Sequence, residues 1–251
     1  MMDGTEHPGT INLVSLYYSI RYCPCLLADY NVYVNDYDLL DQPEKFARDL
    51  AAALAQPLPG RAAQRRMASV HRQWMPFDEA GLRHSAILAL FYPSTSGMAL
   101  LFTLRPSHLA HHGGQVCFPG GGREAVDGSL MQTALRETAE ELGIATASVR
   151  VLGQLTSLYI DSSRNLVQPY VGWLPSLPML HPDAREVEKV LNVSLRTLLD
   201  PATRTTYKWS KNGPVGVWPS YYTNGIHIWG ATAMMVSELL EIVSGMLARC
   251  N

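Results

Sequence analysis

The segment from residue 120 to residue 143 constrains the fold most, because three consecutive glycines precede a helix whose two ends are both marked. Ser129 is followed three residues later by Gln132, a spacing typical of the capping box that begins a helix. Gly143 supplies the residue type that most often ends one. Between these ends, apolar residues recur at helical spacing: Leu135, Ala139 and Leu142. The sequence therefore predicts a helix from Ser129 to Leu142 that follows a glycine-rich turn.

The predicted helix carries three carboxylates that can share one face. Glu137 lies three residues before Glu140 and four before Glu141. Like charges at this spacing repel by about 0.2–0.5 kcal/mol per pair in an isolated helix, and a divalent cation with oxygen ligands would offset that repulsion. The glycines in front of the helix allow backbone N–H groups to approach an anion. This combination suits phosphate-ester chemistry, and an acidic, solvent-exposed face beside an ordinary turn is the alternative.

Composition excludes several classes of protein. The 251 residues include 20 basic and 22 acidic side chains, and a net charge of −2 provides no broad basic surface for a nucleic acid. A hydrophobic share of 47% with 17% charged residues favours a folded core. No apolar run reaches the roughly 18–20 residues of a membrane helix, and the first ten residues lack the Lys or Arg of a secretion signal. Four cysteines in so long a chain form no disulfide framework, so we expect a cytoplasmic protein.

Short apolar runs on both sides of the predicted helix indicate strands. Residues 84–92 and 98–105 are separated by Pro, Ser, Thr and Gly, which predicts a hairpin. Further strands are expected over residues 149–158, 167–174, 189–195 and 226–229, and further helices over residues 42–54 and 231–247. This order predicts a helix–sheet–helix sandwich, of the α/β class, in one domain from residue 39 to residue 251. Residues 1–38 show neither the helical nor the strand period of apolar residues, and we interpret them as an extension of unknown role. A start codon placed too early is one explanation.

At the glycine turn and its helix the chain resembles the Nudix hydrolases, whose motif reads G-x5-E-x7-R-E-U-x-E-E-x-G-U with U aliphatic. The match is strong from Arg136 to Ile144, whereas the first half departs from the motif. Counting back from Arg136 puts Gly128 where the first glutamate is expected. Counting forward from Gly121 puts Asp127 there instead, with one extra residue before the second half. The resemblance implies an α/β/α sandwich with a mixed β-sheet.

A preceding motif resembles the coenzyme A pyrophosphatase branch of this family, whose signature runs L-L-T-x-R-(S/A)-x3-R-x3-G-x3-F-P-G-G. The residues in register with it are Thr103, Arg105, Gly114 and residues 118–121. Pro106 stands where Ser or Ala is expected, and Ala110 where the second Arg is expected. The missing Arg would weaken contact with a phosphate of coenzyme A unless a nearby histidine replaces it: His108, His111 or His112.

The resemblance also implies a reaction and a metal. Glu137, Glu140 and Glu141 would bind Mg²⁺ or Mn²⁺, Glu140 would also belong to the catalytic set, and Arg136 would orient the carboxylates. A water molecule activated by the metal would attack one phosphorus of the coenzyme A diphosphate. The products would be 4′-phosphopantetheine, or its acyl form, and adenosine 3′,5′-bisphosphate.

Substrate contacts and the general base follow from the same resemblance. The residues expected to contact the substrate or shape its turn are Arg105, His112, Gly120 and Gly121. Glu186, in the loop after Pro182, is our candidate for the general base outside the motif. An exposed loop carboxylate with no role in the reaction is the alternative, because Glu side chains are mostly exposed.

Two other functions stay open at this stage. One is hydrolysis of a different nucleoside diphosphate derivative such as ADP-ribose, and the other is a non-catalytic Nudix domain that binds a nucleotide. We expect a small-molecule ligand in each case, and no nucleic-acid or membrane partner. A homodimer is compatible with the sequence. Cys117 is expected to pack in the core rather than act as a nucleophile. Tyr221, Tyr222 and Trp229 would stack on an adenine or, alternatively, pack in the core.

Overall fold

The computed structural model describes residues 38–249, apart from residues 73, 75–80, 110–111 and 211–214. The extension expected over residues 1–38 therefore lies outside the described residues except for its last position. The α-helices are α2 (Pro43–Leu54), α3 (Gly60–Arg65), α4 (Leu130–Leu142), α5 (Leu195–Leu199) and α6 (Gly230–Leu247). Short 3-10 helices are η2 (Asp38–Asp41), η3 (Thr146–Ser148), η4 (Asp161–Ser163) and η5 (Pro201–Thr203).

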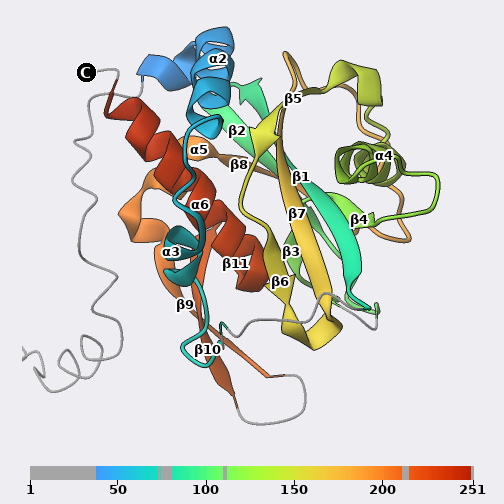
Figure 1. The fold of residues 1–251 in the computed structure, drawn as a ribbon. Coiled ribbons are helices and arrows are strands. Elements are labelled where there is room, and N and C mark those ends of the chain that lie inside the picture. The colour runs from blue at the N-terminus through green and yellow to red at the C-terminus, as the bar shows by residue number, and fades with distance from the viewer. Residues whose placement is uncertain (1–37, 73, 75–80, 110–111, 211–214, 250–251) are drawn as a thin grey trace, which may run out of the picture. The chain divides into compact units, whose positions relative to one another are not determined.

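Eight strands form a mixed sheet, which confirms the predicted fold class. They are β1 (Arg83–Ser94), β2 (Gly97–Leu104), β3 (Val116–Cys117), β4 (Gly120–Gly122), β5 (Arg150–Gln154), β6 (Leu158–Ile160), β7 (Asn165–Trp173) and β8 (Lys189–Ser194). The order β3-β2-β1-β7-β5 forms the main path, with β4 paired to β1, β6 to β7 and β8 to β2. β1 and β7 run parallel, and the other pairs are antiparallel. Figure 1 shows this sheet between α6 on one side and α4 on the other.

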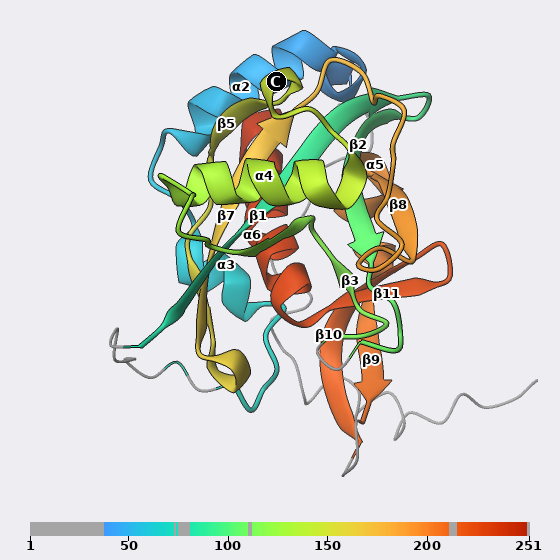
Figure 2. The same ribbon diagram turned by 90° about the vertical axis from the view of Figure 1, so that its right-hand side faces the viewer.

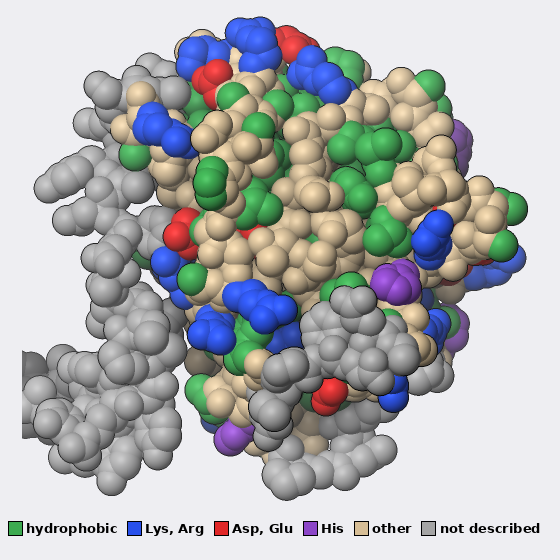
Figure 3. All heavy atoms as spheres, in the orientation of Figure 1, with side chains coloured by type: hydrophobic (Ala, Val, Ile, Leu, Met, Phe, Trp, Pro, Cys, Tyr) green, Lys and Arg blue, Asp and Glu red, His purple; other side chains and the backbone are tan. Residues whose placement is uncertain are grey.

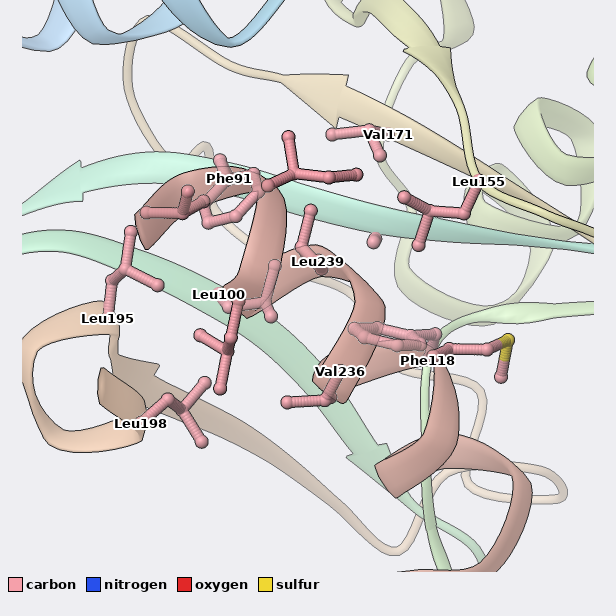
Figure 4. Packing of buried hydrophobic residues seen from close by; sticks show 14 of the residues in the cluster. Phe91, Leu100, Phe118, Leu155, Val171, Leu195, Leu198, Val236 and Leu239 are labelled. Carbon is pink, nitrogen blue, oxygen red and sulfur yellow. The ribbon is translucent and has the colours of Figure 1, made fainter. Parts of the chain in front are cut away.

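β1 is almost continuously apolar because helices cover both faces of the sheet. Its alternate residues Ala86, Leu88 and Leu90 pack in a cluster that includes Ala134 and Leu142 of α4. The intervening residues of β1 join a second cluster on the side of α6. Figure 4 shows part of that cluster, in which Val236 and Leu239 of α6 lie among Phe91, Leu100 and Phe118. The sheet is therefore the middle layer of a three-layer sandwich. The apolar face of α4 packs on this sheet.

The predicted elements of the first half are found with small shifts. Gln42 precedes α2, and β1 and β2 form the expected hairpin, with Leu90 opposite Leu101 and Ser94 opposite Gly97. The single strand expected over residues 149–158 is wrong, because the structure divides this stretch into β5 and β6. Both strands pair with β7.

A separate three-stranded sheet contains β9 (Arg204–Trp209), β10 (Gly216–Thr223) and β11 (Ile226–Trp229) in the order β11-β10-β9. Of these strands, the sequence predicted β11 alone. Tyr221 and Ile228 on one face of this sheet are buried in the cluster on the side of α6. The small sheet thus completes the core at the end of the chain, beside α5 and α6.

α6 corrects one expectation about the sequence. By length and composition it is apolar enough to cross a membrane, with 18 residues and a mean hydropathy of 1.3. However, 78% of its residues are buried inside the protein, which is the pattern of a core helix. Figure 3 views this side of the molecule and shows hydrophobic side chains in patches, separated by polar and charged groups.

Candidate active site

α4 begins and ends as the sequence predicted. The Ser129 hydroxyl oxygen accepts a hydrogen bond from the backbone N–H of Gln132 at 3.2 Å, and Gly143 closes the helix with a φ of 72°. The helix packs on β1 and β4, and Figure 2 shows it lying across the front of the sheet. Its carboxylates therefore project beside the glycines of β4.

Asp127 and Arg136 form a partly buried ion pair between the glycine-rich turn and α4. The Arg136 guanidinium donates from Nε and Nη2 to the two carboxylate oxygens of Asp127, at 3.0 and 2.9 Å. Asp127 also accepts hydrogen bonds from the Thr133 hydroxyl and the Glu124 backbone N–H, both at 2.9 Å. The hydrogen bond from Arg136 is the largest cause that holds the pKa of Asp127 well below its usual range. Asp127 therefore stays ionised.

This ion pair resolves the register of the motif. Counting forward from Gly121 places the carboxylate correctly, at Asp127, with one extra residue in the turn. Asp127 is a site residue that the sequence-based prediction missed. The sequence does point to Asp127 when the motif is counted forward from Gly121, but the count back from Arg136 points to Gly128 instead.

Arg136 links the turn to the acidic face of α4. Its Nη2 also donates to the carbonyl oxygen of Gly122 at 3.0 Å. Its Nη1 lies 2.8 Å from a carboxylate oxygen of Glu140 and 3.1 Å from one of Glu137. The guanidinium thus contacts two of the three expected metal ligands, as an orienting residue should.

At Gly120 the backbone of β1 excludes a side chain, and at Gly121 the Glu137 carboxylate occupies the space of one. A Cβ at Gly121 would lie 2.4 Å from the carboxylate of Glu137, and one at Gly120 would lie 2.3 Å from the carbonyl oxygen of Ala86. β4 pairs with β1, so its backbone cannot move away from that strand. The glycines therefore allow the Glu137 carboxylate to rest directly on the backbone of β4.

Glu141 is the most buried carboxylate of the site, with 2% of its surface exposed. Its Oε2 accepts a hydrogen bond from the Gly120 N–H at 3.2 Å, and its Oε1 lies 3.8 Å from Nη1 of Arg105. The pKa of Glu141 is raised to about 8, chiefly by burial; the charges of Glu186 and Glu137 also raise it, whereas the Gly120 N–H and Arg105 lower it. The residues of two motifs, one before and one after the turn, thus meet at this carboxylate.

Glu186 lies on an exposed loop beside this cluster. Its charge contributes to the raised pKa of both Glu137 and Glu141, although burial is the larger cause in each case. The structure therefore brings Glu186 into electrostatic reach of the two buried carboxyls, which a loop without a role in the site need not do. Its part in the reaction remains a prediction.

The donor set suits a hard divalent cation but does not form a closed cage. Within the described residues, no three His, Cys, Asp or Glu side chains are placed to hold one metal ion together. Glu140 is largely exposed and pairs with Arg136, so its place among the metal ligands remains a prediction. The raised pKa values of Glu137 and Glu141 show that Arg136, Arg105 and the Gly120 N–H do not fully offset burial of these oxygens. A divalent cation is the kind of group that would offset it, and carboxylate oxygens are its preferred ligands.

Comparisons with known proteins agree with this geometry. The NUDIX domain family matches residues 82–174. A protein of Photorhabdus laumondii subsp. laumondii named "Uncharacterized Nudix hydrolase NudL" is 37% identical over 163 residues, which cover 64% of this chain and 85% of the relative. The chain belongs to the Nudix hydrolases.

This Nudix hydrolase has further relatives of the same description. A NudL protein of Yersinia enterocolitica is 39% identical over 150 residues, covering 58% of this chain and 74% of the relative. Among solved structures, the MutT protein of Methanosarcina mazei Go1 is 17% identical with a TM-score of 0.44, covering 66% of this chain and 96% of that one.

Two expected substrate contacts in this Nudix hydrolase have different outcomes. Arg105 lies beside Glu141, within the acidic cluster. His112 is exposed, adopts a left-handed φ of 58°, and its Nδ1 lies 3.0 Å from the amide oxygen of Gln115. Its contact with a phosphate remains a prediction. Ala110 and His111 lie outside the described residues.

Most of the other residues considered in the sequence analysis pack against neighbouring side chains. The Cys117 sulfur lies 3.2 Å from the Thr103 hydroxyl, and burial raises the pKa of its thiol to about 11, as expected of a packing residue. Tyr221 is buried in the core. Trp229 contacts other aromatic rings of the small sheet, whereas Tyr222 is exposed and packs against His227.

Proposed function

We propose that this Nudix hydrolase cleaves the diphosphate of coenzyme A or its thioesters with the help of Mg²⁺ or Mn²⁺. The observation that carries this proposal is the position of Arg105. This residue of the coenzyme A signature lies 3.8 Å from Glu141 of the Nudix motif, and Gly120 of the same signature donates its N–H to Glu141. A signature residue beside a metal-ligand candidate is well placed to contact a phosphate of the substrate.

Each residue of the site has a part in this reaction. A divalent cation held by Glu137 and Glu141, with Glu140 as a further ligand, would lower the pKa of water and neutralise charge on the diphosphate. Arg136 fixes the orientation of Glu137 and keeps α4 against the glycine turn. Arg105 orients the substrate through charge-assisted hydrogen bonds to phosphate oxygens. Glu186 accepts the proton of the attacking water as general base.

A panel of diphosphates tests this proposal. The purified protein is incubated with coenzyme A, ADP-ribose and NADH, in Mg²⁺ or Mn²⁺ and in a chelator control, and the products are separated by chromatography. We expect adenosine 3′,5′-bisphosphate and 4′-phosphopantetheine from coenzyme A, and the highest kcat/KM for that substrate. A clear preference for ADP-ribose would overturn the choice of substrate.

The Glu141→Gln variant tests whether the domain is catalytic through these carboxylates. Because it removes an expected metal ligand but keeps the size of the side chain, we expect kcat to fall by orders of magnitude while the fold is retained. A variant with near-normal turnover would show that the metal assignment is wrong. A wild-type protein that binds a nucleotide without cleaving it would favour a binding domain instead.

A further inference from the structure

The loop between β7 and β8 is fastened to both motifs of the site by backbone hydrogen bonds. The Asp183 N–H donates to the carbonyl oxygen of Glu141, and the His181 N–H to that of Leu142, both at 2.9 Å. At its other end, the Glu188 N–H donates to the carbonyl oxygen of Leu104 at 2.8 Å, directly before Arg105. The turn from residue 183 to residue 188 therefore spans from the end of α4 to the end of β2.

Asp183 organises this turn with both its backbone and its side chain. Its carbonyl oxygen accepts hydrogen bonds from the N–H groups of Glu186 and Val187, at 2.9 and 2.8 Å. Its Oδ1 accepts one from the Arg185 N–H at 2.9 Å, which closes the turn locally, and the Arg185 side chain also bonds the carboxylate. These bonds from Arg185 lower the pKa of Asp183 to about 2, so the carboxylate is ionised near neutral pH.

Glu186 is the residue that these contacts place. Its own N–H is bound by Asp183, and the next residue, Val187, is 3% exposed and packs in the cluster under α4. Asp183 is in turn bound to Glu141. The backbone of Glu186 is thus connected to the backbone of Glu141 through two consecutive hydrogen bonds.

We propose that Asp183 is a positioning residue that holds Glu186 beside the site formed by Glu137 and Glu141. This inference rests on the proposed function, in which Glu186 accepts a proton during the reaction. In this role Asp183 acts through Glu186, by limiting the positions that the Glu186 carboxylate can adopt. A displacement of about 1 Å at a reacting group can cost up to a hundredfold in rate, so a loosened turn is sufficient to lower turnover.

Four variants separate this role from a purely structural one. Asp183→Ala removes the side-chain acceptor of the Arg185 N–H and keeps the backbone acceptor of Glu186 and Val187. Asp183→Asn keeps an oxygen for the Arg185 N–H, because Asn forms the same kind of turn as Asp. Arg185→Gln removes the ion pair from an 87% exposed side chain and leaves the Oδ1 bond in place. Glu186→Gln provides the background in which a positioning effect has nothing left to act on.

The first measurement is amide hydrogen exchange in the metal-free protein. We expect faster exchange over residues 184–188 in Asp183→Ala, and wild-type exchange there in Asp183→Asn and Arg185→Gln. The remaining residues should keep their wild-type exchange, because the turn lies on the surface. Unchanged exchange over residues 184–188 in Asp183→Ala would overturn the proposal, whatever the activity of the enzyme.

The second measurement is a double-mutant cycle on kcat, with the diphosphate that the wild-type protein cleaves fastest. We expect Asp183→Ala to lower kcat about tenfold with little change in KM, and Asp183→Asn to keep about half of the wild-type kcat. In the Glu186→Gln background, Asp183→Ala should have no further effect. An equal loss in both backgrounds, or a Glu186→Gln variant with wild-type kcat, would refute the positioning role.

The outcome for the substrate is independent of this cycle. A preference for ADP-ribose over coenzyme A would change the proposed function, and the cycle would then be measured with ADP-ribose. If coenzyme A is the substrate and the cycle shows no coupling between Asp183 and Glu186, the role of Asp183 is refuted and the proposed function stands.

Discussion

Glu141 is the residue at which burial and charge oppose each other most directly. A carboxyl whose pKa rises on folding stabilises the protein fully below its ordinary pKa of 4.5, and this stabilisation is lost as the pH rises through its folded pKa of about 8. We therefore expect the Tm of the metal-free protein to fall by at least a few degrees between pH 5 and pH 8. Thermal unfolding in a chelator, followed by circular dichroism, measures this slope.

Two substitutions on the same helix provide the controls. Glu141→Gln removes the titrating group and should flatten the decrease, whereas Glu140→Gln changes an exposed carboxylate and should leave it in place. If Glu141→Gln retained the wild-type slope, another group would be responsible for the loss of stability at high pH.

Asp127 is expected to support the carboxylates that would bind the metal, through its ion pair with Arg136. Asp127→Asn removes the charged partner that binds the Arg136 guanidinium with two hydrogen bonds on the side of the turn, so Arg136 should no longer hold Glu137 in one orientation. We expect kcat to fall by about 10–100-fold, the range typical of residues that support a metal ligand. Steady-state kinetics beside a thermal unfolding curve test this, and Glu124→Gln is a matched control on the rim of the turn, because its carboxylate lies 4.0 Å from Arg136.

The sequence predicted the positions of Glu137 and Glu141 correctly but left that of Asp127 undecided, and the difference has a physical reason. Helical spacing is rigid, so the positions of Glu137 and Glu141 followed from the count alone. The turn before α4 accommodates an extra residue, so spacing could not decide between Gly128 and Asp127. Spacing also placed Glu140 with the other two carboxylates, whereas in the structure it pairs with Arg136 at the edge of the site. Which carboxylates pair with Arg136 depends on the three-dimensional contacts of the turn and the helix, and periodicity alone does not determine it.

At the scale of single elements, the small sheet was the main failure of the sequence-based prediction. β10 contains Pro219, which lacks an N–H for the ladder and usually argues against a strand. β9 alternates Arg, Thr and Lys with Thr, Tyr and Trp, and so carries none of the aliphatic residues that mark a core strand. What stabilises these strands is contact between aromatic rings: Tyr207, Trp209, Trp218 and Trp229, with centroids of neighbouring pairs 5.2–5.5 Å apart.

Trp218 provides a test of that packing. Its indole N–H is buried and has no hydrogen-bond partner among the described residues, so the ring contributes through packing alone. Trp218→Phe keeps an aromatic ring and removes the unpaired donor, and we expect a stability close to the wild type. Trp218→Ala should lower the free energy of unfolding by about 2 kcal/mol. Urea unfolding followed by tryptophan fluorescence compares the two, and equal losses would show that the N–H does find a partner.

For the whole molecule, the layered architecture was predictable because it depends on a pattern repeated in many residues. β1 and β2 are long apolar runs, and such strands must be covered on both faces. A helix before them and a helix after them supply one covering layer, and α4 supplies the other. Contacts between segments far apart in the chain leave no such pattern, and these had to come from the structure.

Glu238 makes the clearest contact of that kind and can be tested by stability. It lies fully buried in α6, where one oxygen accepts a hydrogen bond from Gln64 Nε2 at 2.9 Å and the other from the Thr156 N–H at 3.1 Å. Gln64 in α3 also donates to the carbonyl oxygen of Thr156 at 2.9 Å. The three segments that meet here come from the beginning, middle and end of the described chain.

Glu238→Ala would leave the Thr156 N–H and one of the two N–H groups of Gln64 Nε2 without an acceptor, at a cost of about 1–3 kcal/mol for each. We expect the free energy of unfolding to fall by about 3 kcal/mol, with an unchanged m value in urea because the extent of the fold is the same. Glu241→Ala is the matched control on the same helix, because its ion pair with Arg66 of the α3 end is partly exposed and such pairs are worth at most about 1 kcal/mol. If the two variants lost the same stability, the buried network would contribute no more than a surface ion pair, and apolar packing of α6 alone would join the first and last helices of the sandwich.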